Sequence, residues 1–136
     1  MAQLQPYCAI EGNDDGLPVV FVHGMGVDHR SLMMLDKAFD GNDSIRRIYL
    51  DLPGFGRTPA LPEHACGLPE MAGWPPTAIY GLVGKAAPFA MVGNSMGGAL
   101  VREVLAREPR RVAGTALIGP GVDPAHAGAH GAGHGG

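Results

Sequence analysis

The chain has 136 residues, of which 46% are hydrophobic and 17% charged, with a formal net charge of −3. This size suits one globular domain, and the slightly acidic balance argues against a nucleic-acid or anionic-membrane partner. The N-terminus lacks a basic stretch followed by a long apolar run, and no apolar stretch could span a bilayer. Cys8 and Cys66 have no metal-ligand spacing, so we expect two reduced thiols in a cytoplasmic protein.

Short apolar runs alternate with helical patterns along the first part of the chain. Residues Leu17–Val22 (LPVVFV) are apolar and β-branched, which predicts a buried strand. Residues 29–39 carry apolar side chains on one side and predict a helix. The run RRIYL at 46–50 predicts the next strand, and residues 2–12 leave room for one or two short strands.

The same alternation continues in the second half. Residues 53–76 are rich in Pro and Gly and predict a loop, followed by one or two helical turns at 77–83. A strand at 89–92, an amphipathic helix at 98–107 and a final strand at 112–118 complete the series. Strands that alternate with helices predict an α/β protein with a mostly parallel sheet, right-handed crossovers and flanking helices.

The composition changes abruptly at residue 119. Residues 119–136 are rich in Gly, His and Ala, and glycines every few residues make a helix improbable there. We therefore predict two parts, a folded portion over 1–118 and a disordered tail over 119–136. Histidines 126, 130 and 134 would align on a helix, but the glycines oppose one, so no metal site is expected.

The motif G-x-S-x-G stands at residues 93–97, between a predicted strand and a predicted helix. A serine at such a turn is held in a strained backbone conformation with its Oγ exposed, and Gly93 and Gly97 must lack side chains because they crowd the turn. The helix N-terminus directs amide N–H groups at the serine. An ordinary helix N-cap serine is the alternative, but it needs no such pair of glycines.

Three motifs together resemble the α/β-hydrolase fold family, in particular bacterial esterase-, peptidase- and haloperoxidase-like serine hydrolases. The first is VVFVHGMG at 19–26, the second DLPGFG at 51–56, and the third the serine turn at 93–97. The resemblance implies a partial α/β-hydrolase fold whose later strands and cap are absent, as in a C-terminally truncated member. It also implies a hydrolase that acts on an ester, amide or similar acyl bond without a cofactor.

The resemblance assigns roles to individual residues. Ser95 is the expected nucleophile, and the backbone amides of Met25 and Met96 are the expected oxyanion-hole donors. His23, read by itself, is a possible catalytic base, whereas the resemblance makes it a structural residue that orders the oxyanion loop. Residues 28–30 either face the pocket or form a solvated helix start with Asp28 as its N-cap. The remaining residues expected to shape these loops are Gly24, Asp51, Gly54, Gly56, Gly93 and Gly97.

In this family the nucleophile is followed along the chain by the acid and then by the histidine. After Ser95 the candidates are Asp123 and His126, which a Gly-rich segment would hold poorly. A catalytically impaired fragment or a non-catalytic interaction module is therefore the alternative function. The final strand would leave an apolar sheet edge, open to a second copy or another chain. The expected ligand is a small acyl substrate, with no metal, nucleic acid or membrane.

Overall fold

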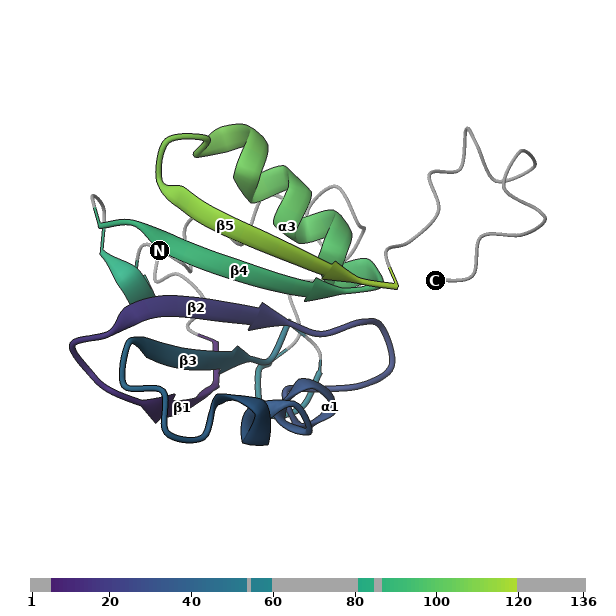
Figure 1. The fold of residues 1–136 in the computed structure, drawn as a ribbon. Helices are drawn as coiled ribbons and strands as arrows, with labels where there is room; N and C mark the ends of the chain where they lie inside the picture. Colours follow the sequence, from purple (N-terminus) through teal and green to yellow (C-terminus); the bar gives the residue numbers. More distant parts are fainter. Residues whose placement is uncertain (1–5, 54, 60–80, 85–86, 120–136) are drawn as a thin grey trace.

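The computed structural model describes residues 6–53, 55–59, 81–84 and 87–119. Within these residues five strands form one sheet in the order β1-β3-β2-β4-β5 (Figure 1). No helix in the described part of the chain is long and apolar enough to cross a membrane. The elements are β1 (Cys8–Gly12), β2 (Leu17–Val22), α1 (Arg30–Met33), the 3-10 helix η1 (Asp36–Phe39), β3 (Ile45–Leu50), β4 (Phe89–Asn94), α3 (Met96–Arg107) and β5 (Val112–Ile118).

The sheet is mostly parallel, which confirms the predicted fold class. β2 lies parallel to β3 on one side and to β4 on the other, and β4 lies parallel to β5. The exception is β1, which pairs antiparallel with β3 and confirms a short strand near the N-terminus. The carboxyl ends of β2, β3 and β4 therefore meet at one edge, which is where ligands bind in open α/β sheets.

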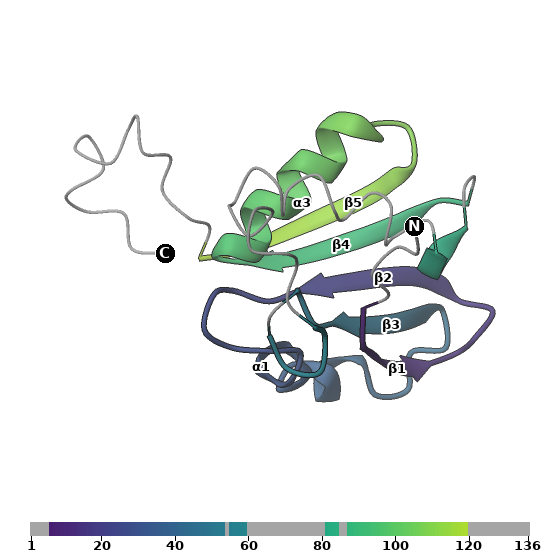
Figure 2. The same cartoon turned by 180° about the vertical axis from the view of Figure 1, so that it is seen from behind.

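Two layers cover the sheet, and the alternation of side chains along the central strands supplies both (Figures 1 and 2). Val20 and Val22 of β2 point into a core cluster that includes Leu100 and Val104 of α3. Phe21 points the other way, into a cluster with Leu32 of α1 and Tyr49 of β3, and partly buried Phe39 packs against it. β2 and β3 are thus buried on both faces, as parallel strands usually are.

The prediction of one continuous helix over residues 29–39 is wrong. It is divided into α1 and η1, joined by turns with i→i+3 hydrogen bonds. Asp36 accepts hydrogen bonds from Arg47 Nε and Tyr49 Oη, both at 2.6 Å, and Phe39 meets the ring of Phe21 edge-on. A segment this short is marginal as a helix by itself, so these tertiary contacts decide its path.

The second half of the chain matches the prediction more closely, with shifted boundaries. β4 extends through Asn94, and α3 begins at Met96, two residues before the predicted start. Leu100, Val101 and Val104 form the buried face of α3, while Leu105 is 38% exposed. Of the predicted helical turns at 77–83, residues 81–83 are helical and the others lie outside the described residues, as does most of the loop predicted at 53–76.

Candidate active site

Ser95 forms the turn between β4 and α3 by itself, because β4 ends at the residue before it and α3 begins at the residue after it. Its φ of 54° is the one positive φ among the described non-glycine residues, and the residue is exposed. Its side chain makes no capping hydrogen bond to the helix, although the residue stands at the N-cap position. An ordinary N-cap serine has a β-region backbone and caps with its Oγ, so this turn differs in both respects.

Glycines make this turn possible by close backbone packing. A Cβ on Gly93 would lie 2.7 Å from the Gly97 carbonyl oxygen, and one on Gly97 would collide with the Val22 and His23 carbonyl oxygens. α3 is therefore pressed against the ends of β4 and β2. A Cβ on Gly24 would lie 3.8 Å from Ser95 Oγ, so the loop that follows β2 passes beside the serine.

His23, at the end of β2, is fully buried and both of its ring nitrogens are engaged. Nδ1 lies 2.6 Å from the Gly24 carbonyl oxygen and donates to it, because Nε2 accepts the Leu52 N–H at 2.9 Å. Burial lowers the pKa of His23, since an imidazolium would lose its hydration. A neutral ring with both nitrogens occupied ties two loops together and is unsuited to proton transfer.

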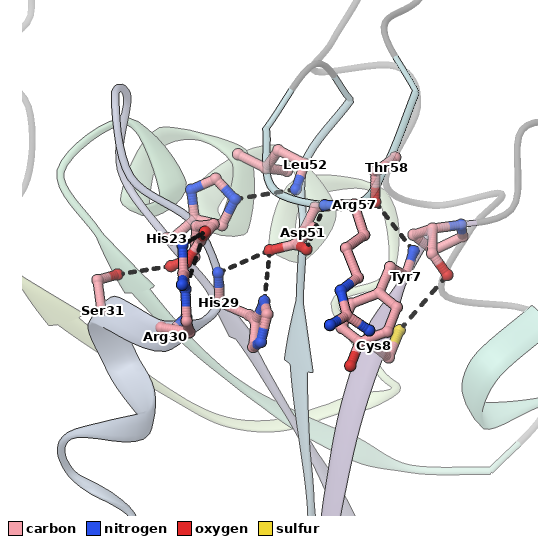
Figure 3. Close-up of polar contacts among 12 residues, drawn as sticks. Tyr7, Cys8, His23, His29, Arg30, Ser31, Asp51, Leu52, Arg57 and Thr58 are labelled. Atoms are coloured by element: carbon pink, nitrogen blue, oxygen red, sulfur yellow. Dashed lines mark hydrogen bonds and ion pairs between the residues drawn. The ribbon is translucent and has the colours of Figure 1, made fainter.

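Asp51 directly follows β3, and its buried carboxylate collects three donors (Figure 3). Oδ1 accepts the His29 backbone N–H at 2.7 Å and His29 Nδ1–H at 2.8 Å, while Oδ2 accepts the Arg57 N–H at 2.9 Å. A Cβ on Gly56 would overlap this carboxylate. The positive φ of Gly56, 54°, also favours a glycine there.

The backbone of Asp51 is held as firmly as its side chain. Thr58 Oγ1 donates to the Asp51 carbonyl oxygen at 2.8 Å and accepts the Tyr7 N–H at 2.9 Å. The Arg57 guanidinium lies over the Tyr7 ring, 4.9 Å from its centre. The segment before β1, the loop after β3 and the loop after β2 are thus joined around one carboxylate.

Two hollows adjoin these loops. The larger, about 550 Å³, is lined by residues that include Gly26, Val27, Ser31 and Phe55. Asp28 and Arg30 line both hollows and pair with each other, with Arg30 Nη2 2.7 Å from Asp28 Oδ2. Hydrogen bonds from Arg30 lower the pKa of Asp28 to about 2. Asp28 also accepts the Arg30 backbone N–H at 3.0 Å. The prediction of Asp28 as the helix N-cap is wrong, because α1 begins at Arg30 with His29 as its N-cap and no side-chain capping bond. Residues 28–30 thus line a hollow and lead directly into α1.

Asp28, His29 and Asp51 are also the one group in the described residues whose ligand atoms lie close enough to share a cation, within 4.8 Å of one another. His29 and Asp51 already bond to each other, and Asp28 is paired with Arg30. The donor set is therefore satisfied without a metal. The resulting network is one of hydrogen bonds and ion pairs.

The structure brings together Ser95, His23, Gly24, Asp51 and Gly56 at the carboxyl ends of β2, β3 and β4. Met25 continues the same loop from Gly24, and Met96 opens α3. Gly54, Asp123 and His126 lie outside the described residues. The sequence patterns do not identify His29 as a partner of Asp51. The available signal was its place after β2, since β2 and β3 are neighbours and their carboxyl ends meet.

Comparison with known proteins places this geometry in a family. A family model described as alpha/beta hydrolase fold matches residues 18–136. An alpha/beta superfamily hydrolase from Oenococcus oeni is 25% identical, with a TM-score of 0.74 over 86% of this chain and 45% of that one. A 2-hydroxy-6-oxo-6-phenylhexa-2,4-dienoate hydrolase from Rhodococcus is 27% identical, with a TM-score of 0.72 over 88% and 43%.

A monoacylglycerol lipase from Paleococcus ferrophilus is 25% identical, with a TM-score of 0.67 over 86% of this chain and 44% of that chain. Curated proteins gave no significant sequence match. The chain spans less than half the length of these solved structures. The family match covers most of the sequence. The chain therefore belongs to the α/β hydrolase fold family.

Proposed function

We propose that the protein is a serine hydrolase that cleaves an ester, amide or similar acyl bond, with Ser95 as its nucleophile. In this reaction Ser95 Oγ attacks the acyl carbon while its proton passes to a base, and the tetrahedral intermediate then expels the leaving group, which takes up that proton. Water hydrolyses the resulting acyl-enzyme and releases Ser95. The proposal needs an exposed hydroxyl, donors for the oxyanion and a base.

The proposal rests on Ser95 being both exposed and held in a strained backbone conformation. A positive φ at a non-glycine residue costs roughly 1–3 kcal/mol, which the surrounding packing must offset. Gly93 and Gly97 permit that packing, because either Cβ would strike backbone atoms. The strain is not used for capping, since Ser95 Oγ makes no bond to the helix. Strain retained at an exposed hydroxyl supports a chemical role for that hydroxyl.

Two backbone amides are the proposed oxyanion donors. Met96 N–H belongs to the first turn of α3, whose opening N–H groups have no partner within the helix and carry its positive dipole end. Met25 N–H follows Gly24, whose Cα region lies beside Ser95. Removing one such donor from a hydrolase typically lowers kcat by about 10²–10³-fold. Both amides are therefore assigned to stabilise the developing negative charge.

The proposal takes the base from outside the described residues. Both ring nitrogens of His23 are engaged. His29 binds Asp51 through Nδ1 alone, but the hydrogen bonds of the described residues include none between His29 and Ser95. His126 and Asp123 remain the candidates for base and acid after the nucleophile. Loss of the histidine in a comparable triad lowers kcat by about 10⁶-fold, so the placement of this base decides the turnover rate.

Labelling with a fluorophosphonate probe tests the proposal. The chain has only three serines, Ser31, Ser44 and Ser95, so intact mass spectrometry followed by peptide mapping identifies the labelled one. We expect one adduct, located at Ser95 and absent in Ser95→Ala. The matched control Ser44→Ala should label like the original chain. Folded protein that takes up no probe, or takes it up at Ser31 or Ser44, contradicts the proposal.

The edge formed by β5 supports a second candidate, an interaction module that pairs with a second copy of this chain. β5 is the last strand of the sheet in the described residues, and its sequence VAGTALI has no charge and no proline. Leu117 and Ile118 are 36% and 42% exposed. Uncharged apolar edges of this kind favour strand pairing, and two copies related by a two-fold axis would extend the sheet.

The alternation of N–H groups along β5 provides the test. The Ile118 carbonyl accepts the Ser95 N–H and so points toward β4, which directs the Thr115 N–H away from the sheet. Proline at 115 therefore removes an outward donor and leaves the pairing with β4 in place. Light scattering should show a dimer for the original chain and for the control Thr115→Ser, and a monomer for Thr115→Pro. A monomeric original chain excludes this candidate.

A further inference from the structure

The loop between β2 and α1 is fastened at both of its ends to the loop after β3. At the first end, His23 Nε2 accepts the Leu52 N–H at 2.9 Å. At the second end, Asp51 Oδ1 accepts the His29 backbone N–H at 2.7 Å and the ring Nδ1–H at 2.8 Å. Leu52 and Asp51 are adjacent in sequence, so one short segment supplies both anchors (Figure 3).

The residues between these anchors have little else to hold them. Met25, Gly26 and Val27 are exposed, and no backbone–backbone hydrogen bond among the described residues involves any of the three. Gly26, with a φ of 81°, adds conformational freedom. The direction of the Met25 N–H is therefore set chiefly by where the two ends of the loop are held.

The second anchor is built as a rigid point. The Asp51 carboxylate is fully buried and also accepts the Arg57 N–H at 2.9 Å. Its carbonyl oxygen accepts from Thr58 Oγ1 at 2.8 Å, and its side chain fills the space that Gly56 leaves. A buried carboxylate with several N–H donors makes charge-assisted bonds, which are stronger than neutral ones. Asp51 therefore holds His29 more firmly than a neutral side chain would.

We infer that Asp51 and His29 are positioning residues that orient the Met25 amide toward Ser95. Neither side chain needs to touch the substrate, because Asp51 acts through His29 and His29 acts through the loop. The inference rests on the proposed function, in which Met25 N–H is an oxyanion donor. A network that only stabilised the fold would be equally served by another polar cluster, and Asp36 with Arg47 and Tyr49 forms a partly buried one elsewhere in the molecule.

The experiment uses the full chain labelled with ¹⁵N-methionine, so that each methionine amide gives a separate NMR signal. Met25 is assigned by its loss in Met25→Leu, and the strand residue Met91 serves as an internal reference. In Asp51→Asn and in His29→Gln we expect the Met25 signal to shift or broaden while that of Met91 stays in place. Asp36→Asn, the same chemical change in the other cluster, should lower stability and leave the Met25 signal unchanged.

The labelling rate of Ser95 gives the second readout. If Met25 N–H is an oxyanion donor, Asp51→Asn should label about 10²-fold more slowly, the loss expected for one misplaced donor. If the original chain takes up no label, the proposed function is contradicted. The Met25 signal would still show whether Asp51 and His29 position the Met25 amide. If Asp51→Asn does not fold, the Met25 signal of His29→Gln tests the inference instead. The inference is overturned when both variants keep the original Met25 signal, or when Asp36→Asn moves it as much.

Discussion

The loops around Asp51 and the strand β5 are opposite solutions to the same requirement, the pairing of backbone polar groups. Around Asp51, the N–H groups of Tyr7, His29, Leu52 and Arg57 are each paired with a specific side-chain atom. β5 pairs with β4 on one side and presents its other side outward. One region is closed by the chain itself, whereas no strand in the described part of the chain pairs with the outer side of β5.

This difference shows how unevenly a substitution should act in this protein. In the closed region a small change meets backbone on several sides, so its cost is high. On β5 the same change meets open space.

Adding one methyl group against the backbone of His23, which binds the closed region through Leu52, and one on β5 gives the strongest contrast. Gly97→Ala would press its Cβ against the Val22 carbonyl oxygen and within 2.5 Å of the His23 carbonyl oxygen. Backbone cannot move aside as a side chain can, so we expect a loss of about 3 kcal/mol in the free energy of unfolding. Urea denaturation followed by circular dichroism measures it.

Gly114→Ala on β5 is the matched control. Its Cβ would have no heavy atom within 4 Å, and the residue has no positive φ. Replacing a strand glycine should then stabilise the chain by about 0.5 kcal/mol through the unfolded state. Equal losses for the two variants would mean that the two regions are packed alike, and the contrast would fail.

The rate of thiol alkylation is a second measure of the difference between the region around Asp51 and β5. Cys8 lies on β1 near Asp51, and burial first, then the Asp51 charge, raise its pKa to about 11 from 9.0. Because the thiolate is the reacting form, a rise of two pKa units slows alkylation near pH 8 by about 100-fold. In a Cys66→Ser background, iodoacetamide should modify Cys8 about that much more slowly than a cysteine introduced by Thr115→Cys on β5.

The rate of Cys8 also reports on the charge of Asp51. If the carboxylate contributes to the raised pKa, Asp51→Asn should speed the modification of Cys8 and leave that of the β5 cysteine unchanged. Equal rates for Cys8 and the introduced cysteine in folded protein would show that β1 is as open as β5.

Much of the architecture follows from sequence patterns because those patterns are local. The β-branched run before His23 predicts β2, and the glycines on either side of Ser95 predict a tight strand-to-helix turn. These features depend on neighbours within a few residues, so the sequence displays them directly. The family match and the sheet topology confirm the fold class that they indicated.

The pairing of His29 with Asp51 could not be predicted, because the partners are 22 residues apart and meet only when β2 and β3 pair. The helix expected over residues 29–39 fails for the same reason. Its path is set by the contacts of Asp36 with Arg47 and Tyr49, on a strand that follows it. Where long-range polar contacts outweigh local propensity, a helical pattern is a weak guide.

The closed region should also respond to acid in a way that β5, which has no titratable residue, cannot. Burial lowers the pKa of His23 from its ordinary 6.5, so between that lowered value and pH 6.5 the unfolded chain binds a proton that the folded chain does not. Stability therefore rises with pH through this window and is level above it. The limit for one proton is about 1.4 kcal/mol per pH unit.

Urea unfolding at pH 7.5 and pH 5.5 measures this dependence. His23→Gln keeps an acceptor for the Leu52 N–H and a donor for the Gly24 carbonyl but removes the titrating group. We expect the original chain to lose more stability than His23→Gln on going to pH 5.5, by at most about 1.4 kcal/mol. Thr115→Ser on β5 should show the full loss of the original chain. An equal loss in His23→Gln would mean that acid acts elsewhere and that the ring of His23 is not held neutral by its two loops.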